Sequence, residues 1–187
     1  MLLWTFPVET WRGRTPVVSQ GYRPGHDGVD IMFRRVPADA VEFPVGTQSS
    51  KGFVCPTDEV GVVAVADGTL VRAGLMPNGH YAVIDHGGGV HTLYLHMSRL
   101  LVPVTKTSDK NHPRVRAGER IGLVGFSPLD GQRLPHLHFE VWKGNDHTKH
   151  VDPAPFLRGA RVGGFINFEL VLLLALAGAA YVLANYV

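Results

Sequence analysis

The chain has 187 residues, of which 45% are hydrophobic and 18% are charged, with a formal net charge of +2 and a single cysteine. This length and composition are typical of one globular domain, and they exclude a disordered, collagen-like or disulfide-stapled chain. The basic residues are scattered instead of clustered, so nothing in the sequence supports nucleic-acid binding. Cys55 has no second cysteine to pair with, and we interpret it as a packing residue.

The N-terminal segment, residues 1–17, does not have the features of a signal peptide. It lacks a basic start, and Pro7 and Glu9 interrupt its apolar run. The sequence therefore predicts no conventional export signal.

The residues that follow favour β-strands. Apolar runs at 61–66 and 69–74 flank the pair Asp67-Gly68, which suits the turn of a β-hairpin. Runs at 81–85 and 90–97 repeat this arrangement around three consecutive glycines, residues 87–89. Further strands are expected at 120–125 and 136–142.

Two segments, 34–59 and 102–114, are rich in proline, polar and charged residues and are predicted to be long loops. No strong amphipathic helix precedes residue 162. Short strands, glycine turns and the absence of such a helix predict an all-β or β-rich single domain.

The C-terminal segment differs in composition, since Glu169 is the only charged residue beyond Arg161. Residues 170–187 are uncharged and mostly apolar, and as a helix they would span about 27 Å, just enough to cross a bilayer. We expect a linker at 157–169 followed by a hydrophobic helix. Two interpretations stay open for this helix: a membrane anchor, or a helix that packs against an assembly partner.

Candidate chemistry lies on the predicted strands. Side chains alternate along a strand, so the stretch from Pro135 to Val141 presents His136, His138 and Glu140 on one face and apolar residues on the other. By the same alternation, Tyr94 and His96 are expected to share one face of their strand, opposite Leu93, Leu95 and Met97.

Upstream, His26 and Asp30 stand four residues apart across Gly28, a spacing at which a loop that enters a strand can aim both side chains at one point. A divalent metal held by one or both of His136 and His138 would explain that pair. With one of them, His26 and Asp30 complete a two-histidine, one-carboxylate set that leaves a coordination position for water. The alternative is a polar cleft lined by histidines. The other histidines are interpreted as structural: His80, His86, His91, His112, His147 and His150.

These motifs, in this order, resemble the lysostaphin-type (LytM-type) zinc endopeptidases, which cut peptide bonds in bacterial peptidoglycan. Their pattern is H-x-G-x-D, then a strand histidine, then H-x-H. The resemblance covers about residues 18–156. It implies a single antiparallel-sheet peptidase domain with a groove across the sheet.

Carried over residue by residue, the resemblance implies that His26, Asp30 and His138 bind one zinc ion and that His96 and His136 are catalytic. Tyr94 is a weaker candidate for substrate contact, with a half-buried structural tyrosine as the alternative. Two stretches depart from the family pattern: 34–59, which looks like an insertion, and 126–134, before the H-x-H.

Three other functions stay open. A two-histidine, one-carboxylate set also holds iron in non-haem oxygenases, which metal identity and oxygen dependence would distinguish. The second is a module that binds peptidoglycan without cutting it, and the third is a structural component of a larger assembly.

Location is a separate expectation. The expected substrate, peptidoglycan, lies outside the cytoplasmic membrane. Arg158 and Arg161, just before the apolar segment, instead favour a domain on the cytoplasmic side of a membrane. Delivery by a phage virion would reconcile the two, and a tail-anchored host enzyme is the alternative.

Overall fold

The computed structural model describes residues 4–163, apart from 47, 128, 130–133 and 145–148. Its strands are β1 (Val17–Gln20), β2 (Val29–Arg34), β3 (Phe53–Val54), β4 (Gly61–Val63), β5 (Gly68–Met76), β6 (Gly79–Asp85), β7 (Val90–Leu100), β8 (Arg114–Val115), β9 (Arg120–Val124), β10 (Leu137–Lys143) and β11 (His150–Val151). Its two one-turn helices within the described residues are α1 (Asp39–Glu42) and α2 (Ala154–Leu157).

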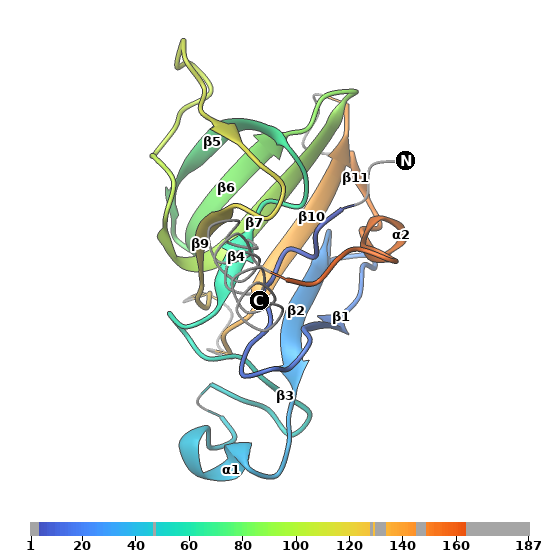
Figure 1. Ribbon diagram of the computed structural model, residues 1–187, viewed down its shortest axis with the longest axis vertical. Coiled ribbons are helices and arrows are strands. Elements are labelled where there is room, and N and C mark those ends of the chain that lie inside the picture. Colours follow the sequence, from blue (N-terminus) through green and yellow to red (C-terminus); the bar gives the residue numbers. More distant parts are fainter. Residues whose placement is uncertain (1–3, 47, 128, 130–133, 145–148, 164–187) are drawn as a thin grey trace, which may run out of the picture.

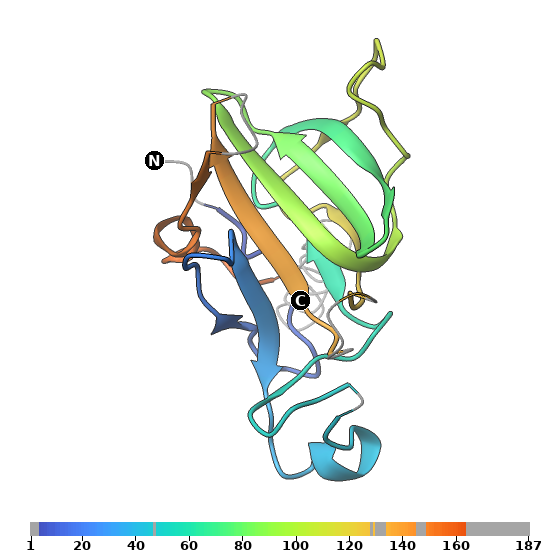
Figure 2. The same ribbon diagram turned by 180° about the vertical axis from the view of Figure 1, so that it is seen from behind.

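One antiparallel sheet organises the molecule. Its main path runs β1-β2-β10-β7-β6-β5-β8, with β11 beside β10, β3 beside β2, and β9 joining β7 to β4. Figures 1 and 2 show β10, far along the chain, lying between β2 and β7. The expected β-rich, antiparallel fold is confirmed.

The sequence predicted two hairpins, and only the second of them, around residues 87–89, forms. β6 and β7 pair around Gly87, Gly88 and Gly89, all of which have positive φ, as a tight glycine turn requires. The prediction of a hairpin across Asp67-Gly68 is wrong. Neither residue has the positive φ that such a turn needs, and β4 pairs with β9 whereas β5 pairs with β6 and β8.

The side chain of Asp67 accepts a hydrogen bond instead of forming a hairpin turn. Its carboxylate accepts a hydrogen bond from the backbone N–H of Ala117 at 2.8 Å, next to the turn that enters β9. This bond ties the bend between β4 and β5 to the turn that enters β9.

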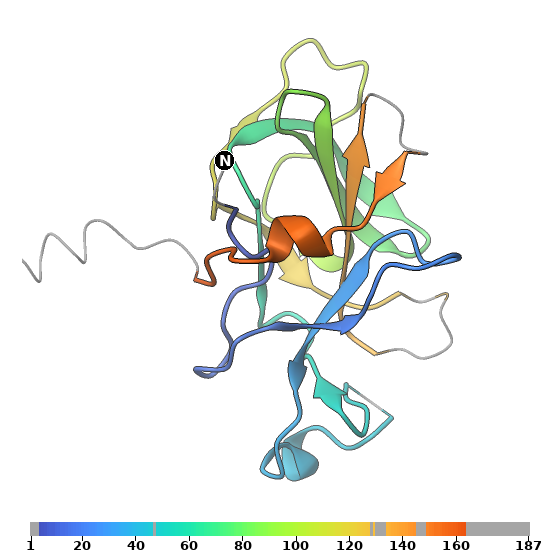
Figure 3. The same ribbon diagram turned by 90° about the vertical axis from the view of Figure 1, so that its right-hand side faces the viewer.

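The core lies between the sheet and the N-terminal segment. Trp4 stacks on Phe156 of α2 with ring centroids 4.9 Å apart and meets the edge of Phe139 of β10 at 6.4 Å. Figure 3 shows α2 close to this segment. Val8 is fully buried and bridges to Val62 of β4, so residues 4–11 contribute directly to the core.

The segment 34–59 is mostly loop, as expected, and contains α1 and the short β3. Figure 1 shows α1 beyond the end of β2 and β3. Among the described residues, three ion pairs join it to the N-terminal segment: Arg12 with Glu42 at 2.6 Å and with Glu59 at 3.7 Å, and Arg14 with Asp39 at 2.7 Å. Trp11 completes the attachment by packing against Phe33 and Phe43, each with ring centroids 5.5 Å away.

The apolar helix predicted for 170–187 lies outside the described residues. Within the part of the chain that is described, no helix has the length and apolar character to span a membrane.

Trp11→Ala is expected to lower the free energy of unfolding by about 3–5 kcal/mol, because it leaves a cavity among packed aromatic rings. Urea unfolding followed by far-UV circular dichroism measures the loss. The control is Val41→Ala in the segment 34–59, where a side chain that is 92% exposed should change stability by less than about 0.5 kcal/mol. Equal effects of the two variants would show that Trp11 does not anchor the segment.

Candidate metal centre

The pairing of β2 with β10 brings the first and third sequence motifs together. Asp30 of β2 stands directly opposite His138 of β10, and His26 lies in the turn just before β2. Gly28 lets this turn lie against β10, because a Cβ there would be 2.4 Å from the carbonyl oxygen of Phe139 and 2.9 Å from Nε2 of His138. The glycine between His26 and Asp30 is therefore a steric requirement.

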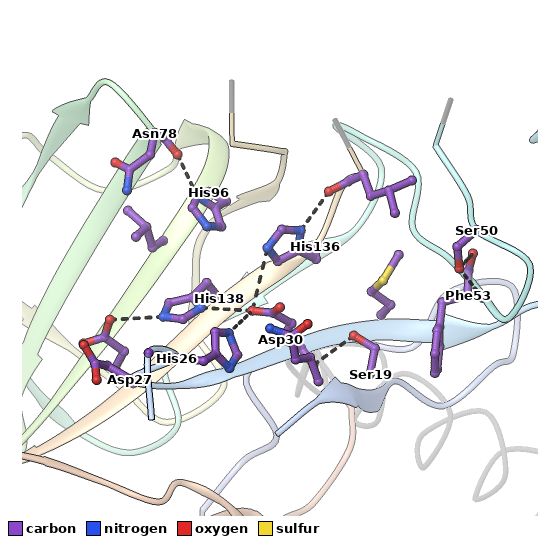
Figure 4. Close-up of a pocket in the computed structure, with 16 residues that line it drawn as sticks. Ser19, His26, Asp27, Asp30, Ser50, Phe53, Asn78, His96, His136 and His138 are labelled. Carbon is purple, nitrogen blue, oxygen red and sulfur yellow. Dashed lines mark hydrogen bonds and ion pairs between the residues drawn. The ribbon is translucent and has the colours of Figure 1, made fainter. Parts of the chain in front are cut away.

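Three side chains converge on one point. Oδ1 of Asp30 is 3.0 Å from Nε2 of His26 and 2.9 Å from Nδ1 of His138. One ligand atom from each residue lies within 4.8 Å of the others. Figure 4 shows Asp30 amid His26, His136 and His138.

The donor set fits zinc. Two imidazole nitrogens and one carboxylate oxygen are ligands that zinc takes in catalytic sites, where a fourth position stays open. Nδ1 of His26 bonds to the carbonyl oxygen of Gly21 at 2.9 Å, which directs the opposite nitrogen, Nε2, towards Asp30.

His96 and His136 lie beside this cluster. Their ring centroids are 4.8 Å apart, and that of His96 is 5.7 Å from His138. In each, Nδ1 bonds to a backbone carbonyl oxygen: that of Asn78 at 2.7 Å for His96, and that of Leu134 at 2.8 Å for His136. Nε2 of His136 is 3.7 Å from Asp30. The structure thus brings all five predicted residues together, while their individual roles stay predictions.

The electrostatics of the cluster are those of a carboxylate surrounded by imidazoles. Burial raises the pKa of Asp30, but the hydrogen bond with His138 and the nearby His136 and His26 outweigh it, and the net pKa is lowered. Burial lowers the pKa of His138, but bonds with Asp30 and Glu140 outweigh it and raise that pKa to about 9. A metal ion would therefore compete with a proton on His138.

These side chains line an open pocket of about 640 Å³ on the face of the sheet. Its wall also includes Ser19 and Gln20 of β1, and Ser50 and Phe53 from the segment 34–59. Figure 4 shows Ser50 and Phe53 at one end and Asn78 at the other. The segment 34–59, which looked like an insertion in the sequence, therefore forms part of the pocket wall.

Tyr94 is not in this pocket, and its expected placement on the face of His96 is wrong. The Tyr94 side chain is fully buried, its hydroxyl oxygen accepts the backbone N–H of Val65 at 2.9 Å, and its ring packs on Phe139 at 5.3 Å. Leu95 lines the pocket beside His96 instead.

A bulge in β7 breaks the alternation. Ala82 of β6 pairs with Tyr94 and His80 with Met97, so β7 spans the same interval with one extra residue. His96 has φ of +66°, in the left-handed region. An extra residue in one strand re-aims a side chain, and here it turns His96 to the pocket.

The sequence predicts Glu140 on the same face as His136 and His138 but gives it no role, and His150 is expected to be structural. Both lie on the side of His138 away from Asp30: Oε1 of Glu140 is 3.1 Å from Nε2 of His138, and Nε2 of His150 is 3.5 Å from Oε2 of Glu140. The alternation along β10 signalled Glu140. No local pattern signalled His150, because its position depends on the pairing of β11 with β10.

The chain belongs to peptidase family M23, whose model matches residues 48–153. The match begins after His26 and Asp30, which reach the site through β2. The family expected from the motifs is thereby confirmed.

Three relatives illustrate the similarity. An uncharacterized metalloprotease of Buchnera aphidicola is 32% identical over 126 residues, which is 66% of this chain and 27% of the relative. The peptidoglycan DD-endopeptidase ShyA of Vibrio cholerae is 31% identical over 140 residues, or 66% of this chain and 30% of ShyA. This chain thus spans under a third of their length. The structure of lysostaphin from Staphylococcus simulans shares the fold, with a TM-score of 0.51, 24% identity, and coverage of 83% and 55% of the two chains.

Tyr94→Phe is expected to lower the free energy of unfolding by about 1–3 kcal/mol, because the buried N–H of Val65 loses its acceptor. Zinc binding should be unchanged, since the hydroxyl lies on the core side of the sheet. Denaturant unfolding and zinc titration measure the two effects. A large loss of zinc affinity without a loss of stability would contradict the placement of Tyr94 in the core.

Proposed function

We propose that this chain is a zinc-dependent endopeptidase that hydrolyses peptide bonds in the stem peptides or cross-bridges of bacterial peptidoglycan. The observation that carries the proposal is the convergence of His26, Asp30 and His138, with His96 and His136 alongside, in one open pocket. Membership of family M23 supports the peptidase activity. The name of the relative ShyA, a peptidoglycan DD-endopeptidase, supports the substrate.

His26, Asp30 and His138 would hold the zinc ion. When bound, zinc lowers the pKa of a coordinated water towards about 7 and polarises the carbonyl of the peptide bond. Asp30 contributes a negative charge between neutral ligands, and its position opposite His138 in the β2–β10 ladder holds it in place.

His96 and His136 would move protons. A neutral imidazole that donates from Nδ1 to a backbone carbonyl has its acceptor lone pair at Nε2. The carbonyl oxygens of Asn78 and Leu134 therefore present each Nε2 as a base. One histidine can take the proton of the attacking water and later deliver it to the leaving amine, while the other, when protonated, donates to the developing oxyanion.

The pocket shape supports a polymeric substrate. The pocket is open along the sheet face and is bounded by β1 and the segment 34–59 at one side and by Asn78 at the other. An extended peptide can lie along such a surface, with its scissile bond next to Asp30.

The proposal is tested on purified peptidoglycan with the full chain loaded with zinc. Mass spectrometry of the released muropeptides should show new peptide termini, and the mass identifies the bond. Chelation and His138→Ala should each abolish release, because both remove the metal site. If zinc binds at the expected stoichiometry and no termini appear, the chain recognises peptidoglycan without cutting it, or serves an assembly, and the proposed activity is wrong.

His96→Gln and His136→Gln are expected to lower kcat by about 10²–10⁴-fold, the usual contribution of a general acid or base. Zinc affinity should stay within about threefold of the wild type, because neither residue is needed as a ligand. The control is His112→Gln, outside the pocket, which should change neither quantity. Loss of zinc from either pocket variant would instead assign that histidine to the metal.

A further inference from the structure

Glu140 lines the same pocket, at the nitrogen of His138 opposite the one that faces Asp30. It is only 8% exposed, yet both carboxylate oxygens are engaged: Oε1 with Nε2 of His138 at 3.1 Å, and Oε2 with the indole N–H of Trp142 at 2.6 Å. All three residues project from the same face of β10, since they are two positions apart. A buried carboxylate needs such partners because desolvation of its charge is costly.

A second layer supports Glu140. His150 of β11 pairs with Trp142, and its ring stacks on the indole with centroids 6.1 Å apart. Nε2 of His150 is 3.5 Å from Glu140, and Nδ1 is 3.2 Å from a carboxylate oxygen of Asp27. A chain of contacts therefore runs from Asp27, next to His26, through His150 and Glu140 to His138.

The tautomer of His138 decides which of its nitrogens can bind a metal. A neutral imidazole carries one proton, and only the other nitrogen has a lone pair for a ligand bond. Carboxylate oxygens face both nitrogens of His138: that of Asp30 at Nδ1 and that of Glu140 at Nε2. A metal ion held by Asp30 and Nδ1 would leave Glu140 as the acceptor for the proton on Nε2. His26, His96 and His136 are each oriented by a neutral backbone carbonyl, whereas His138 faces a charged acceptor, which forms a stronger bond.

We infer that Glu140 is a positioning residue that fixes the Nε2–H tautomer of His138, so that Nδ1 is the ligand atom, and that His150 and Asp27 hold Glu140 in place. This inference rests on the proposed zinc function. It gives Glu140, His150 and Asp27 a supporting role although none of them is a proposed zinc ligand. The steric fit agrees with it: a Cβ at Gly28 would lie 2.9 Å from Cγ of Glu140, so the turn that carries His26 and Asp27 packs directly on Glu140.

The main test is Glu140→Gln, which keeps the shape of the side chain. Its amide has one acceptor oxygen for two facing donors, His138 and Trp142, so one contact becomes unfavourable. Zinc affinity, measured by competition with a chromophoric chelator, should fall about 10–100-fold, the usual effect of losing such a supporting carboxylate.

Trp142→Phe is the matched control. It removes the indole N–H from the other oxygen of Glu140 but leaves the bond to His138, so zinc affinity should stay within about threefold while stability falls. A purely structural role for Glu140 would give the two variants the same small change in affinity. His150→Gln keeps Glu140 and should lower affinity by a smaller factor than Glu140→Gln.

Nitrogen-15 NMR of the zinc-loaded wild type reads the tautomer directly. We expect zinc at Nδ1 of His138 and a proton at Nε2, and this measurement tests the ligand atom even if Glu140→Gln does not fold. Zinc at Nε2, or an affinity of folded Glu140→Gln within about threefold of the wild type, would overturn the inference alone. A wild-type chain that binds no zinc would overturn the proposed function and this inference together.

Discussion

The antiparallel pairing of β2 with β10 is the constraint on which the site depends. This ladder sets Asp30 opposite His138 and carries His26 in on the turn before β2. A slip of one residue would turn Asp30 to the core face and place an apolar side chain opposite His138. Burial of Ile31, Leu137 and Phe139, all fully buried, penalises that slip. The apolar core therefore fixes the geometry of the polar cluster on the other face of the sheet.

The second constraint is the irregularity of β7. A regular strand would place His96 on the face of Tyr94, in the core, where an imidazole would need a buried partner. The extra residue and the left-handed backbone of His96 let Tyr94 stay in the core while His96 reaches the pocket. The bulge thus brings His96 next to His138 from a strand that otherwise serves the core.

Two carboxylates determine the electrostatics around His138. Asp30 and Glu140 flank His138, and the pKa of His138 rises to about 9 because these two carboxylates outweigh its burial. In the metal-free chain, the pair of carboxylates thus favours a proton on the imidazole between them. A divalent cation at Asp30 would supply the same compensation, so the site is arranged for positive charge with or without a metal ion.

The sequence by itself determined the β-rich class, the family, the two faces of β10 and the five residues that meet in the pocket, because strand alternation is a local property and the motifs and their order can be read along the chain. It did not determine the partners of β4 and β5, the core position of Tyr94 or the support of Glu140 by His150. Those depend on which strands pair and where a bulge falls, and such pairings join residues far apart in the chain: Asp30 and His138 are 108 positions apart. Only the tertiary structure decides such contacts, because the burial of the whole core selects among registers that are locally equivalent.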